Sequence, residues 1–341
     1  MARPRIAVCG AGLVGRRHIE QAQKQATLVA IIDPSPAVCA VAKEQNVPLF
    51  VTPEACLEEM RPDGVVIATP NDLHATQAML CLDAGIPVLI EKPIADTLEA
   101  AKAIEAASAR TGVPVLVGHH RRHNPIVKRV IQALKEGLLG DLVAVHGQFW
   151  LYKPDTYFDV AWRAKEGGGP TLINFIHDVD LLRAFCGDIT EILAMRSNHQ
   201  RGQPVEDTAA VLLRFQNGAL GTFSVSDAVS APWSWEMTSA ENPIYPHRPG
   251  ACYQIGGTHG SLSIPDLRLW GHTGKRSWWE PIEAQELNSA STNDDAFAVQ
   301  FRHFLDVIAG AAPQVSAAEG RASLEAVLAV LEAPLSSNEV A

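Results

Sequence analysis

A glycine-rich turn between a short apolar run and a polar helix constrains the fold of this chain more than any other feature. Residues 5–9 (Arg-Ile-Ala-Val-Cys) have the character of a buried strand, and Gly10, Gly12 and Gly15 follow in the pattern Gly-x-Gly-x-x-Gly. The first glycine permits a tight turn, the second lets a dinucleotide pyrophosphate approach the backbone, and the third lets the helix pack closely on the strand. The helix amino terminus, at Leu13 and Val14, would offer free N–H groups to the phosphates. The turn therefore predicts a dinucleotide-binding α/β domain.

An acidic residue ends the second strand of this unit. The apolar run 28–32 is followed by Asp33, which stands 18 residues after Gly15 (33 − 15). A carboxylate at this point accepts hydrogen bonds from the ribose 2′-hydroxyl of NAD and repels the 2′-phosphate of NADP. Because no Arg or Lys follows before Lys43, the sequence favours NAD over NADP.

Strands and helices then alternate at the spacing of parallel βαβ units. We expect strands over 48–51, 64–68, 88–90 and 113–117, and helices over 36–45, up to residue 84 and over 96–111. Asp96 or Thr97 is the expected amino-terminal cap of the last helix.

Glu91, Lys92 and Pro93 follow the apolar run 88–90. Ligands bind outside the carboxyl ends of the strands of an open α/β sheet, so Lys92 is expected to be a cation that faces the cofactor cleft. Pro93 fixes the backbone and also permits a cis peptide. For these three residues alone the alternative is a surface turn with a solvated lysine. The dinucleotide-binding pattern before them favours the functional interpretation.

Composition and charge restrict the class of protein. The chain has 341 residues, of which 47% are hydrophobic and 19% charged, and its formal net charge is −10. This length predicts two domains, and the negative charge disfavours nucleic acid and anionic membranes as partners. The six cysteines are scattered without a Cys-x-x-Cys pair, as is typical of a reducing compartment. Because the first strand starts at Arg5 and no apolar run is long enough to span a bilayer, a cytoplasmic protein is expected.

The pattern changes beyond residue 122. We expect strands over 142–151, 191–197, 208–215, 220–226, 253–256 and 261–264. Asn217 and Gly218 predict a tight hairpin. The expected fold class is therefore α/β, with a doubly wound parallel sheet in domain 1–122 and a mainly antiparallel sheet in domain 123–341. Two apolar stripes with helical period, around Phe301 and Leu328, are assigned to core packing.

The order of motifs resembles the glucose–fructose oxidoreductase and inositol dehydrogenase family, Gfo/Idh/MocA. Beyond the glycine pattern and Asp33, the resemblance is carried by Thr69-Pro70-Asn71-x-x-His74, Glu91-Lys92-Pro93, Gly118-x-x-Arg121-Arg122-x-x-Pro125, Trp162-Arg163, Gly167-Gly168-Gly169 and His177-x-x-Asp180. These motifs cover nearly the whole chain and specify no substrate.

The resemblance implies a fold and an activity. The fold would be a Rossmann domain joined to an α/β domain with a large open sheet, which binds substrate and builds dimers or tetramers. The activity would be NAD(P)-dependent oxidation or reduction of a sugar, cyclic polyol or related ring alcohol. The cofactor contacts that it implies outside the glycine turn and Asp33 are made by Thr69, Pro70, Asn71, His74, Glu91 and Lys92.

Lys92 and His177 are the candidate catalytic residues. Oxidation of a secondary alcohol sends hydride to the nicotinamide and a proton to a base. A cationic Lys92 would hydrogen-bond the reacting oxygen and stabilise developing alkoxide charge. His177 is the better proton acceptor, because imidazole titrates near neutral pH. The alternative for His177 is a satisfied core histidine on an amphipathic helix. The triple glycine before it, which allows close backbone approach to a ligand, favours the catalytic role.

One position departs from the family pattern. Family members often carry an acidic residue one turn before this histidine, and here the position is Ile173. Asn174 lies three residues before His177 and shares its helical face, so we expect it to bind substrate or orient the imidazole. The departure retains Lys92 and His177 and leaves open whether a proton relay operates.

The run 119–124 (His-His-Arg-Arg-His-Asn) is a second departure, because family members more often have apolar or aromatic residues at 119, 120 and 123. We expect His120, Arg121 and Arg122 to face the substrate, since arginine geometry suits a carboxylate. The alternative is an interdomain hinge with Arg122 in a structural ion pair. Adjacent histidines point in different directions and no Cys or carboxylate cluster accompanies them, so no metal site is expected.

Aromatic residues gather before the triple glycine, at Trp150, Tyr152, Tyr157, Phe158 and Trp162. Flat aromatic faces bind sugar rings and cover loops equally well. We expect packing for most of them, and a place at the substrate pocket for Trp162, next to Arg163.

Three function classes remain. The first is an NAD-dependent dehydrogenase or reductase of a ring alcohol or ketone, such as a sugar, a cyclic polyol or a carboxylated dihydrodiol. The second is a redox-neutral glycosidase or lyase with tightly bound NAD, and the third is a non-catalytic NAD-binding regulator. Retention of Lys92 and His177 disfavours the regulator. A small-molecule substrate and a second copy of the chain, in a homodimer or homotetramer, are the expected partners.

Overall fold

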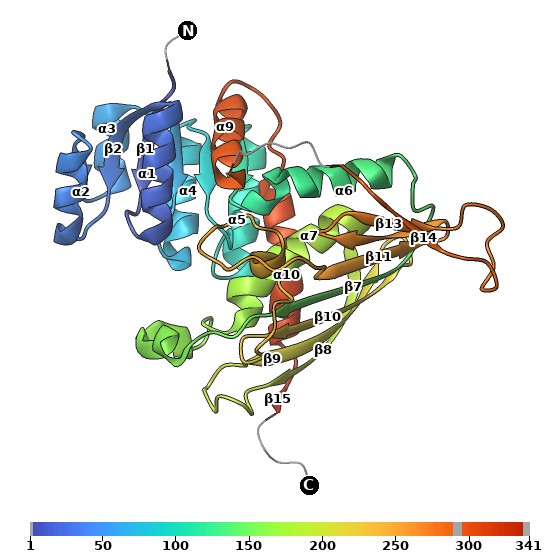
Figure 1. The fold of residues 1–341 in the computed structure, drawn as a ribbon. Helices are drawn as coiled ribbons and strands as arrows, with labels where there is room; N and C mark the ends of the chain where they lie inside the picture. Colours follow the sequence, from blue (N-terminus) through green and yellow to red (C-terminus); the bar gives the residue numbers. More distant parts are fainter. Residues whose placement is uncertain (1–2, 289–294, 337–341) are drawn as a thin grey trace. The chain divides into compact units, whose positions relative to one another are not determined.

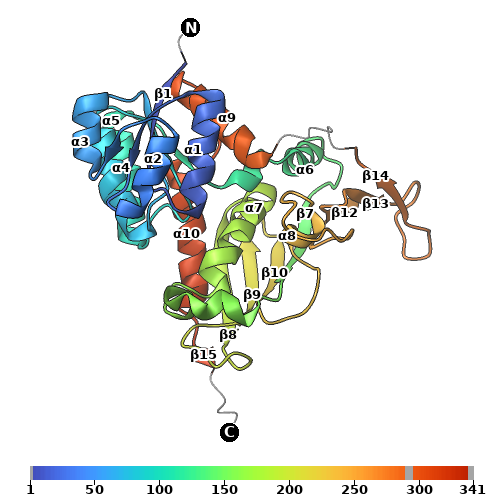
Figure 2. The same cartoon turned by 60° about the vertical axis from the view of Figure 1, so that its left-hand side comes forward.

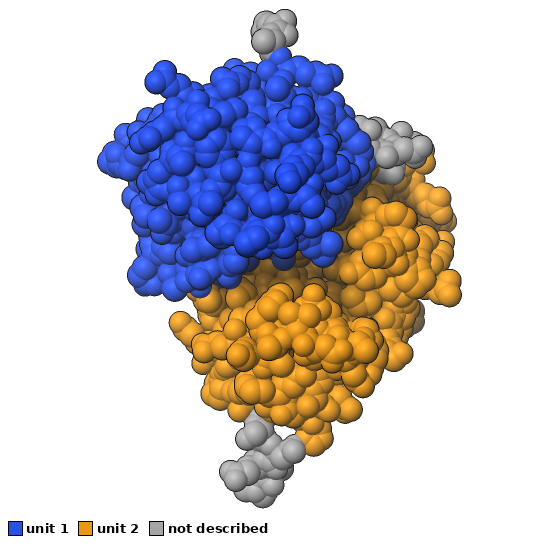
Figure 3. Space-filling model, turned by 90° about the vertical axis from the view of Figure 1, so that its left-hand side faces the viewer, with its two compact units in different colours: residues 1–123, 294–325 blue, residues 124–293, 326–341 orange. Residues whose placement is uncertain are grey.

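The computed structural model describes residues 3–288 and 295–336 and divides the chain into two compact units. Unit 1 comprises residues 1–123 and 294–325, and unit 2 comprises 124–293 and 326–341 (Figure 3). Residues 1–2 of the predicted first domain, and 289–294 and 337–341 of the predicted second, lie outside the described residues. Residues 295–325, which the sequence analysis assigned to the second domain, belong to unit 1. The helical period of the apolar stripe around Phe301 predicts a packed helix but does not indicate which of the two cores the helix joins.

Unit 1 is built on a six-stranded parallel sheet in the order β3-β2-β1-β4-β5-β6. Its strands are β1 (Arg5–Cys9), β2 (Thr27–Ile32), β3 (Leu49–Phe50), β4 (Gly64–Ile67), β5 (Val88–Ile90) and β6 (Val115–Val117). The apolar runs are buried on both faces, as parallel sheets require. The predicted Rossmann fold is confirmed.

Helices cover both faces of this sheet. They are α1 (Leu13–Gln25), α2 (Cys39–Glu44), α3 (Pro53–Met60), α4 (His74–Asp83), α5 (Leu98–Thr111) and α9 (Ala296–Ile308). Figure 2 shows α1 and α9 on one side of the sheet and α3, α4 and α5 on the other. Thr97, one of the two expected caps, begins α5 by accepting a hydrogen bond from Ala100 N at 3.2 Å.

Unit 2 contains a nine-stranded sheet in the order β14-β13-β12-β11-β7-β10-β9-β8-β15 (Figure 1). Its strands are β7 (Leu142–Trp150), β8 (Ile189–Ser197), β9 (Thr208–Phe215), β10 (Leu220–Ser226), β11 (Tyr253–Gly257), β12 (Gly260–Ile264), β13 (Arg268–Gly271), β14 (Glu283–Glu286) and β15 (Leu335–Ser336). The pairing is antiparallel except for β7 with β10 and β8 with β15. The mainly antiparallel sheet is therefore confirmed, while β13, β14 and β15 were not foreseen.

One face of this sheet is covered by helices. Side chains of α6 (Pro125–Lys135), α7 (Ile176–Cys186) and the end of α10 (Ala317–Leu331) form a core with the inward-facing strand residues. Along β9 the alternation is strict, since Val211 and Leu213 are buried while Leu212 is 54% exposed. The other face of the sheet is therefore open. The short helix α8 (Trp235–Thr238) follows β10.

No helix in the described part of the chain is long and apolar enough to cross a membrane.

Candidate active site

Three loops of unit 1 leave the sheet side by side. Cys9, the last residue of β1, pairs with Ile67 of β4, which pairs with Ile90 of β5. The glycine turn, the segment that begins at Ala68 and the segment that begins at Glu91 therefore emerge together at the carboxyl edge of the sheet. This is the edge at which ligands bind in open α/β folds.

The glycine turn has the geometry of a pyrophosphate site. Gly10 has φ +85°, and a Cβ there would lie 2.5 Å from the Ala68 carbonyl oxygen; a Cβ on Gly15 would lie 2.0 Å from the Gly10 carbonyl oxygen. Both glycines are thus required by the chain's own packing. Gly12, the amino-terminal cap of α1, instead faces open space, with no described atom within 4 Å of its Cβ position outside its own helix and neighbours. A phosphate can approach there, beside exposed Leu13 and Val14.

Asp33 is held in place by two backbone amides. Its Oδ2 accepts a hydrogen bond from Ala11 N and its Oδ1 one from Ser35 N, both at 2.9 Å. Each carboxylate oxygen keeps a lone pair, so both remain able to accept a ribose hydroxyl. The donor set of the turn and this carboxylate fit NAD.

His74 connects two of the three loops. Its Nε2 lies 2.9 Å from Thr69 O and its Nδ1 lies 3.0 Å from Pro93 O. Burial lowers the pKa of His74, and the two carbonyl oxygens oppose this only in part. The ring therefore braces the loop after β4 against the segment that carries Lys92. Of the other predicted cofactor contacts in this loop, Pro70 is exposed and Asn71 half-buried.

Glu91 forms a hydrogen bond with a buried histidine, His18, that the sequence patterns did not single out. Nε2 of His18, on α1, is 2.8 Å from Oε1 of Glu91, and Oε2 of Glu91 accepts a hydrogen bond from Lys92 N at 3.2 Å. A Cβ on Gly118 would lie 3.1 Å from the Glu91 carboxyl. Lys92 itself is half-buried, and the Lys92–Pro93 peptide is cis, as the sequence allowed.

The electrostatics of this pair favour a charged carboxylate. Burial by itself would raise the pKa of Glu91, but the hydrogen bond and charge of His18, together with His120 and Lys92, outweigh it and hold the pKa below its ordinary value. A signal for His18 was present, because Gly15, His18, Ile19 and Ala22 follow helical spacing and form the buried face of α1.

The run 119–124 is divided by the boundary between the units. His120–His123 form a single turn at the end of unit 1. The guanidinium of Arg122 pairs with Glu319 at 3.4 Å, and its carbonyl accepts a hydrogen bond from Gln314 at 2.9 Å. These contacts support the structural alternative for Arg122. Within the described residues, no group of three or more His, Cys, Asp or Glu side chains is arranged to hold a metal.

Unit 2 contains a pocket of about 780 Å³. It is lined by Leu151, Tyr152, Lys153, Pro154, Tyr157, Ile173, Asn174, Ser230, Ala231, Pro232, Met237, Tyr245, Pro246 and Arg248. Tyrosine, proline and methionine side chains give it apolar walls, and a small number of polar groups interrupt them. This is the usual character of a small-molecule site.

The segment before His177 departs from a regular helix. Thr171–Phe175 form a π-helical turn, and α7 begins at Ile176 with His177 as its second residue. Such turns often occur at functional sites. Ile173 and Asn174 both line the pocket, and His177 is 8% exposed.

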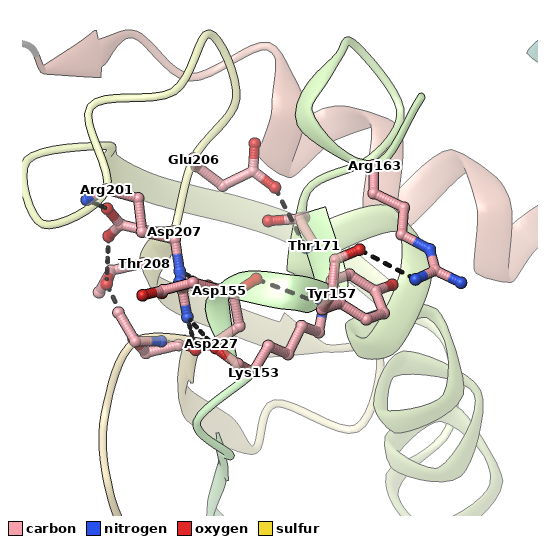
Figure 4. Close-up of polar contacts among 12 residues, drawn as sticks. Lys153, Asp155, Tyr157, Arg163, Thr171, Arg201, Glu206, Asp207, Thr208 and Asp227 are labelled. Atoms are coloured by element: carbon pink, nitrogen blue, oxygen red, sulfur yellow. Dashed lines mark hydrogen bonds and ion pairs between the residues drawn. The ribbon is translucent and has the colours of Figure 1, made fainter. Parts of the chain in front are cut away.

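The triple glycine has an intramolecular explanation. A Cβ on Gly168 would lie 2.6 Å from the Trp162 and Arg163 carbonyl oxygens, and one on Gly169 would lie 2.3 Å from Oε1 of Glu206. Glu206 in turn accepts a hydrogen bond from Thr171 N at 3.1 Å (Figure 4). The space beside Gly168 and Gly169 is thus occupied by the chain's own groups, so these two glycines support ligand contact less strongly than the sequence pattern indicates.

The aromatic residues at the pocket differ from the expected one. Tyr152 and Tyr157 line it, whereas Trp162 is not among the described lining residues and is 54% exposed. Arg163 donates a hydrogen bond to Tyr157 O at 2.9 Å and lies 4.2 Å from the centre of the Tyr157 ring. Arg163 therefore fixes one wall of the pocket from outside.

A buried ionic network supports the floor of this region and was also missed. Nζ of Lys153 lies 3.3 Å from Oδ2 of Asp227, and Nε of Arg201 donates a hydrogen bond to Oδ1 of Asp227 at 2.8 Å (Figure 4). Lys153 follows β7 and Asp227 follows β10. Because these strands pair in parallel, both residues leave the sheet at the same end. The parallel pairing of β7 with β10 could not be predicted from the sequence, because the strands of this domain are otherwise antiparallel.

Comparison with known proteins places the chain in a family. A family model described as "oxidoreductase family, NAD-binding Rossmann fold" matches residues 4–119, and a Gfo/Idh/MocA C-terminal domain model matches residues 127–263. The D-apiose dehydrogenase of Paraburkholderia graminis is 26% identical over 98% of this chain and 87% of that enzyme. The rhizopine catabolism protein MocA of Rhizobium meliloti is 30% identical over an alignment that covers 55% of this chain and 58% of MocA. The chain therefore spans less than two thirds of the length of this relative.

The fold agrees with solved structures. An oxidoreductase from Agrobacterium radiobacter, solved with NAD+, L-tartaric acid and magnesium, superposes with a TM-score of 0.79 over 97% of this chain and 96% of that one, at 20% identity. The two matched domain models span more than half of the sequence, and they lead to one conclusion. The chain belongs to the Gfo/Idh/MocA family of oxidoreductases with an NAD-binding Rossmann fold.

Proposed function

We propose that the protein is an NAD-dependent dehydrogenase or reductase that acts on a ring alcohol or ketone. The observation that carries the proposal is the shared edge of β1, β4 and β5, from which the glycine turn and Lys92 emerge together. A cation beside a dinucleotide cradle suits a reaction in which negative charge develops on a substrate oxygen. Unit 1 would be the cofactor-binding domain, and unit 2 would bind the substrate.

Each catalytic group has a defined role in this proposal. When bound, NAD supplies the nicotinamide that accepts or donates hydride. Lys92 would hydrogen-bond the reacting oxygen, and His177 would accept the proton of the alcohol. Asn174 would hold substrate or imidazole in place of the acid missing at Ile173. The family's sugar-oxidising members, such as the one named D-apiose dehydrogenase, support a sugar, cyclic polyol or related ring as the substrate.

The test is incubation of the purified protein with NAD and a panel of ring alcohols and glycosides, followed by absorbance of reduced nicotinamide. Net NADH formation supports the dehydrogenase. Glycoside cleavage or elimination without NADH would establish the redox-neutral alternative, and NAD binding without turnover of any compound would favour the regulator.

We further propose that a second copy of the chain covers the open face of the nine-stranded sheet. Leu193, Met195 and Leu212 are 59%, 72% and 54% exposed on this face, and Leu193 pairs with Leu212 across the β8–β9 ladder. Glu191 and Arg214 form an ion pair at the rim, so the patch carries both charges and can complement itself. Light scattering after gel filtration should give a dimer or tetramer, and Leu212→Glu should convert it to smaller species. A monomeric wild-type protein would contradict this proposal.

A further inference from the structure

The pocket of unit 2 contains two polar groups that the chain itself does not satisfy. One is Asn174, whose Oδ1 is buried and has no hydrogen-bond partner within the described residues. A buried amide oxygen without a donor is costly. A ligand hydroxyl in the pocket would supply that donor, since Asn174 lines it.

The other is Arg248, the exposed cation of the pocket lining. Its backbone N–H is fixed by a 2.8 Å hydrogen bond to the carbonyl oxygen of Met237, and its guanidinium makes a long 3.4 Å hydrogen bond to His247 O. No Asp or Glu of the described chain forms an ion pair with it. Arg248 thus presents a positive charge to the pocket without a counter-ion among the described residues.

Lys153, the second cation of the pocket, is in a different electrostatic state. Its charge is balanced by Asp227, which also forms an ion pair with Arg201 (Figure 4). The backbone N–H of Arg201 donates a hydrogen bond to Asp207 at 2.8 Å. Lys153 is 7% exposed. An ammonium has three donors, so Lys153 can still donate to a neutral ligand oxygen, but it adds little net charge. Arg248 is the group that would distinguish an anion from a neutral ligand.

The pocket walls restrict the rest of the ligand. Tyr152, Tyr157, Pro232 and Pro246 provide flat apolar surfaces, against which a ring can pack, in a pocket of about 780 Å³. The chain as a whole has a net charge of −10, which repels anions at long range. A dedicated arginine is therefore needed if an anion is to be bound selectively.

We propose that this pocket binds a hydroxylated ring that carries a carboxylate, with the carboxylate on Arg248 and ring hydroxyls on Asn174 and Lys153. The inference rests on the proposed dehydrogenase function and names its substrate class. Arginine binds carboxylates through two parallel hydrogen bonds, which also fixes the orientation of the ring relative to the two hydroxyl-binding groups.

The experiment compares matched pairs of compounds in which a carboxylate replaces a hydroxymethyl group: D-glucuronate with D-glucose, and D-galacturonate with D-galactose. NADH formation is measured for the wild type, Arg248→Gln and Arg248→Lys. Arg268→Gln, at an exposed position on β13 outside the pocket lining, is the matched control.

The wild type should use at least one carboxylated compound with a kcat/KM about 10²-fold above that of its uncharged partner, the effect expected of a close charge pair. Arg248→Gln should lower this value about 10²-fold, mainly through KM, and lower kcat/KM for the uncharged partner far less. Arg248→Lys should restore part of the loss, and Arg268→Gln should resemble the wild type. Equal use of both partners by the wild type, or an equal loss of kcat/KM for both partners in Arg248→Gln, would overturn the inference.

A separate outcome concerns the proposed function. If no compound of either set reduces NAD, the dehydrogenase proposal fails for these rings, and calorimetry with the same carboxylates decides the present inference. Binding that is lost in Arg248→Gln and kept in Arg268→Gln supports it. Absent binding, or binding that Arg248→Gln leaves intact, overturns it.

Discussion

His18 Nε2 lies 2.8 Å from Glu91 Oε1, which joins the first helix of the dinucleotide fold to the residue that precedes the candidate catalytic lysine. His18 is fully buried, and its ring lies 4.4 Å from the ring of Phe297 on α9. Nδ1 of His18 has no hydrogen-bond partner in the described chain. The contact from Nε2 to Glu91 is therefore the one through which His18 acts on the segment that carries Lys92.

We predict that His18→Phe, which keeps the aromatic packing and removes the donor, destabilises the protein by about 1–3 kcal/mol, since the buried Glu91 carboxylate loses a partner. It should also lower turnover, because Glu91 Oε2 holds the backbone of Lys92. Chemical denaturation and steady-state kinetics measure the two effects. His18→Gln, which retains an N–H donor, should recover part of both. Wild-type stability and rate in His18→Phe would show that the pair has no positioning role.

The sequence was sufficient for the fold of the first unit because local and global signals agree there. Short apolar runs such as 64–67, which alternate with helical segments, predict buried parallel strands. Gly10 is required by Ala68 in the loop after β4, and Gly15 by the carbonyl oxygen of Gly10 within the same turn. The packing of α9 against α1 could not be predicted, because a stripe of phenylalanines indicates that a helix is buried but not which helix it packs against. His18 was predictable in principle from its place on the buried face of α1.

The second unit was less predictable for physical reasons. The composition of a strand does not indicate its direction, so the parallel pairing of β7 with β10 could not be predicted. The ion pair between Lys153 and Asp227 depends on that pairing and could not be predicted either. The π-helical turn at Thr171–Phe175 has a different residue spacing from an α-helix, so the sequence alone could not fix which of its side chains share a face with His177. Exposed β13 and β14 carry too little apolar periodicity to mark them as strands.

His74 leads to a prediction about stability and pH. Its folded-state pKa lies below the ordinary value of 6.5, because it is buried. As pH falls below 6.5, this histidine binds a proton in the unfolded chain but not in the folded one. The free energy of unfolding therefore decreases as pH falls, until the pH reaches the folded-state pKa. His74→Gln cannot titrate, and its free energy of unfolding should therefore depend less steeply on pH between 7 and 5, by at most about 1.4 kcal/mol per pH unit. Parallel curves for variant and wild type would contradict this.

Asp33 leads to a prediction about cofactor choice. Its carboxylate is fixed by Ala11 N and Ser35 N, so it cannot turn away from a 2′-phosphate. NADH should bind more tightly than NADPH, and Asp33→Ser should narrow the ratio of the two dissociation constants by at least about 10-fold. Quenching of tryptophan fluorescence by the reduced cofactors measures both constants without turnover. Equal affinities in the wild type would reject the assignment.

His177 and the position one turn before it give a paired prediction. If His177 is the base, the oxidation rate should fall on the acid side of its apparent pKa, and His177→Ala should abolish that limb of the profile. Asn174→Ala should weaken turnover or substrate binding. Ile173→Asp should move the limb upward by raising the basicity of the imidazole, and its unfolding must be measured alongside, because an unpaired buried charge destabilises a fold. An unchanged profile in His177→Ala would direct the search for the base to His119, His120 and His123.

Lys92 is tested by separating binding from chemistry. A group that acts mainly on developing charge in the transition state should contribute little to cofactor affinity. Lys92→Ala should therefore bind NADH nearly as the wild type does and lower kcat at least about 10²-fold. Full turnover in this variant would return Glu91-Lys92-Pro93 to a purely structural role.

The central claim, net hydride transfer between a ring alcohol and NAD, is tested most directly by isotope. A ring alcohol that the panel identifies as a substrate is prepared with deuterium on the carbinol carbon and incubated with NAD, and the reduced cofactor is examined by mass spectrometry. We predict one deuterium in the reduced nicotinamide for each ketone formed by the wild type, and almost none in the same time from Lys92→Ala. Ketone or cleavage product without deuterium in accumulated NADH would contradict the account.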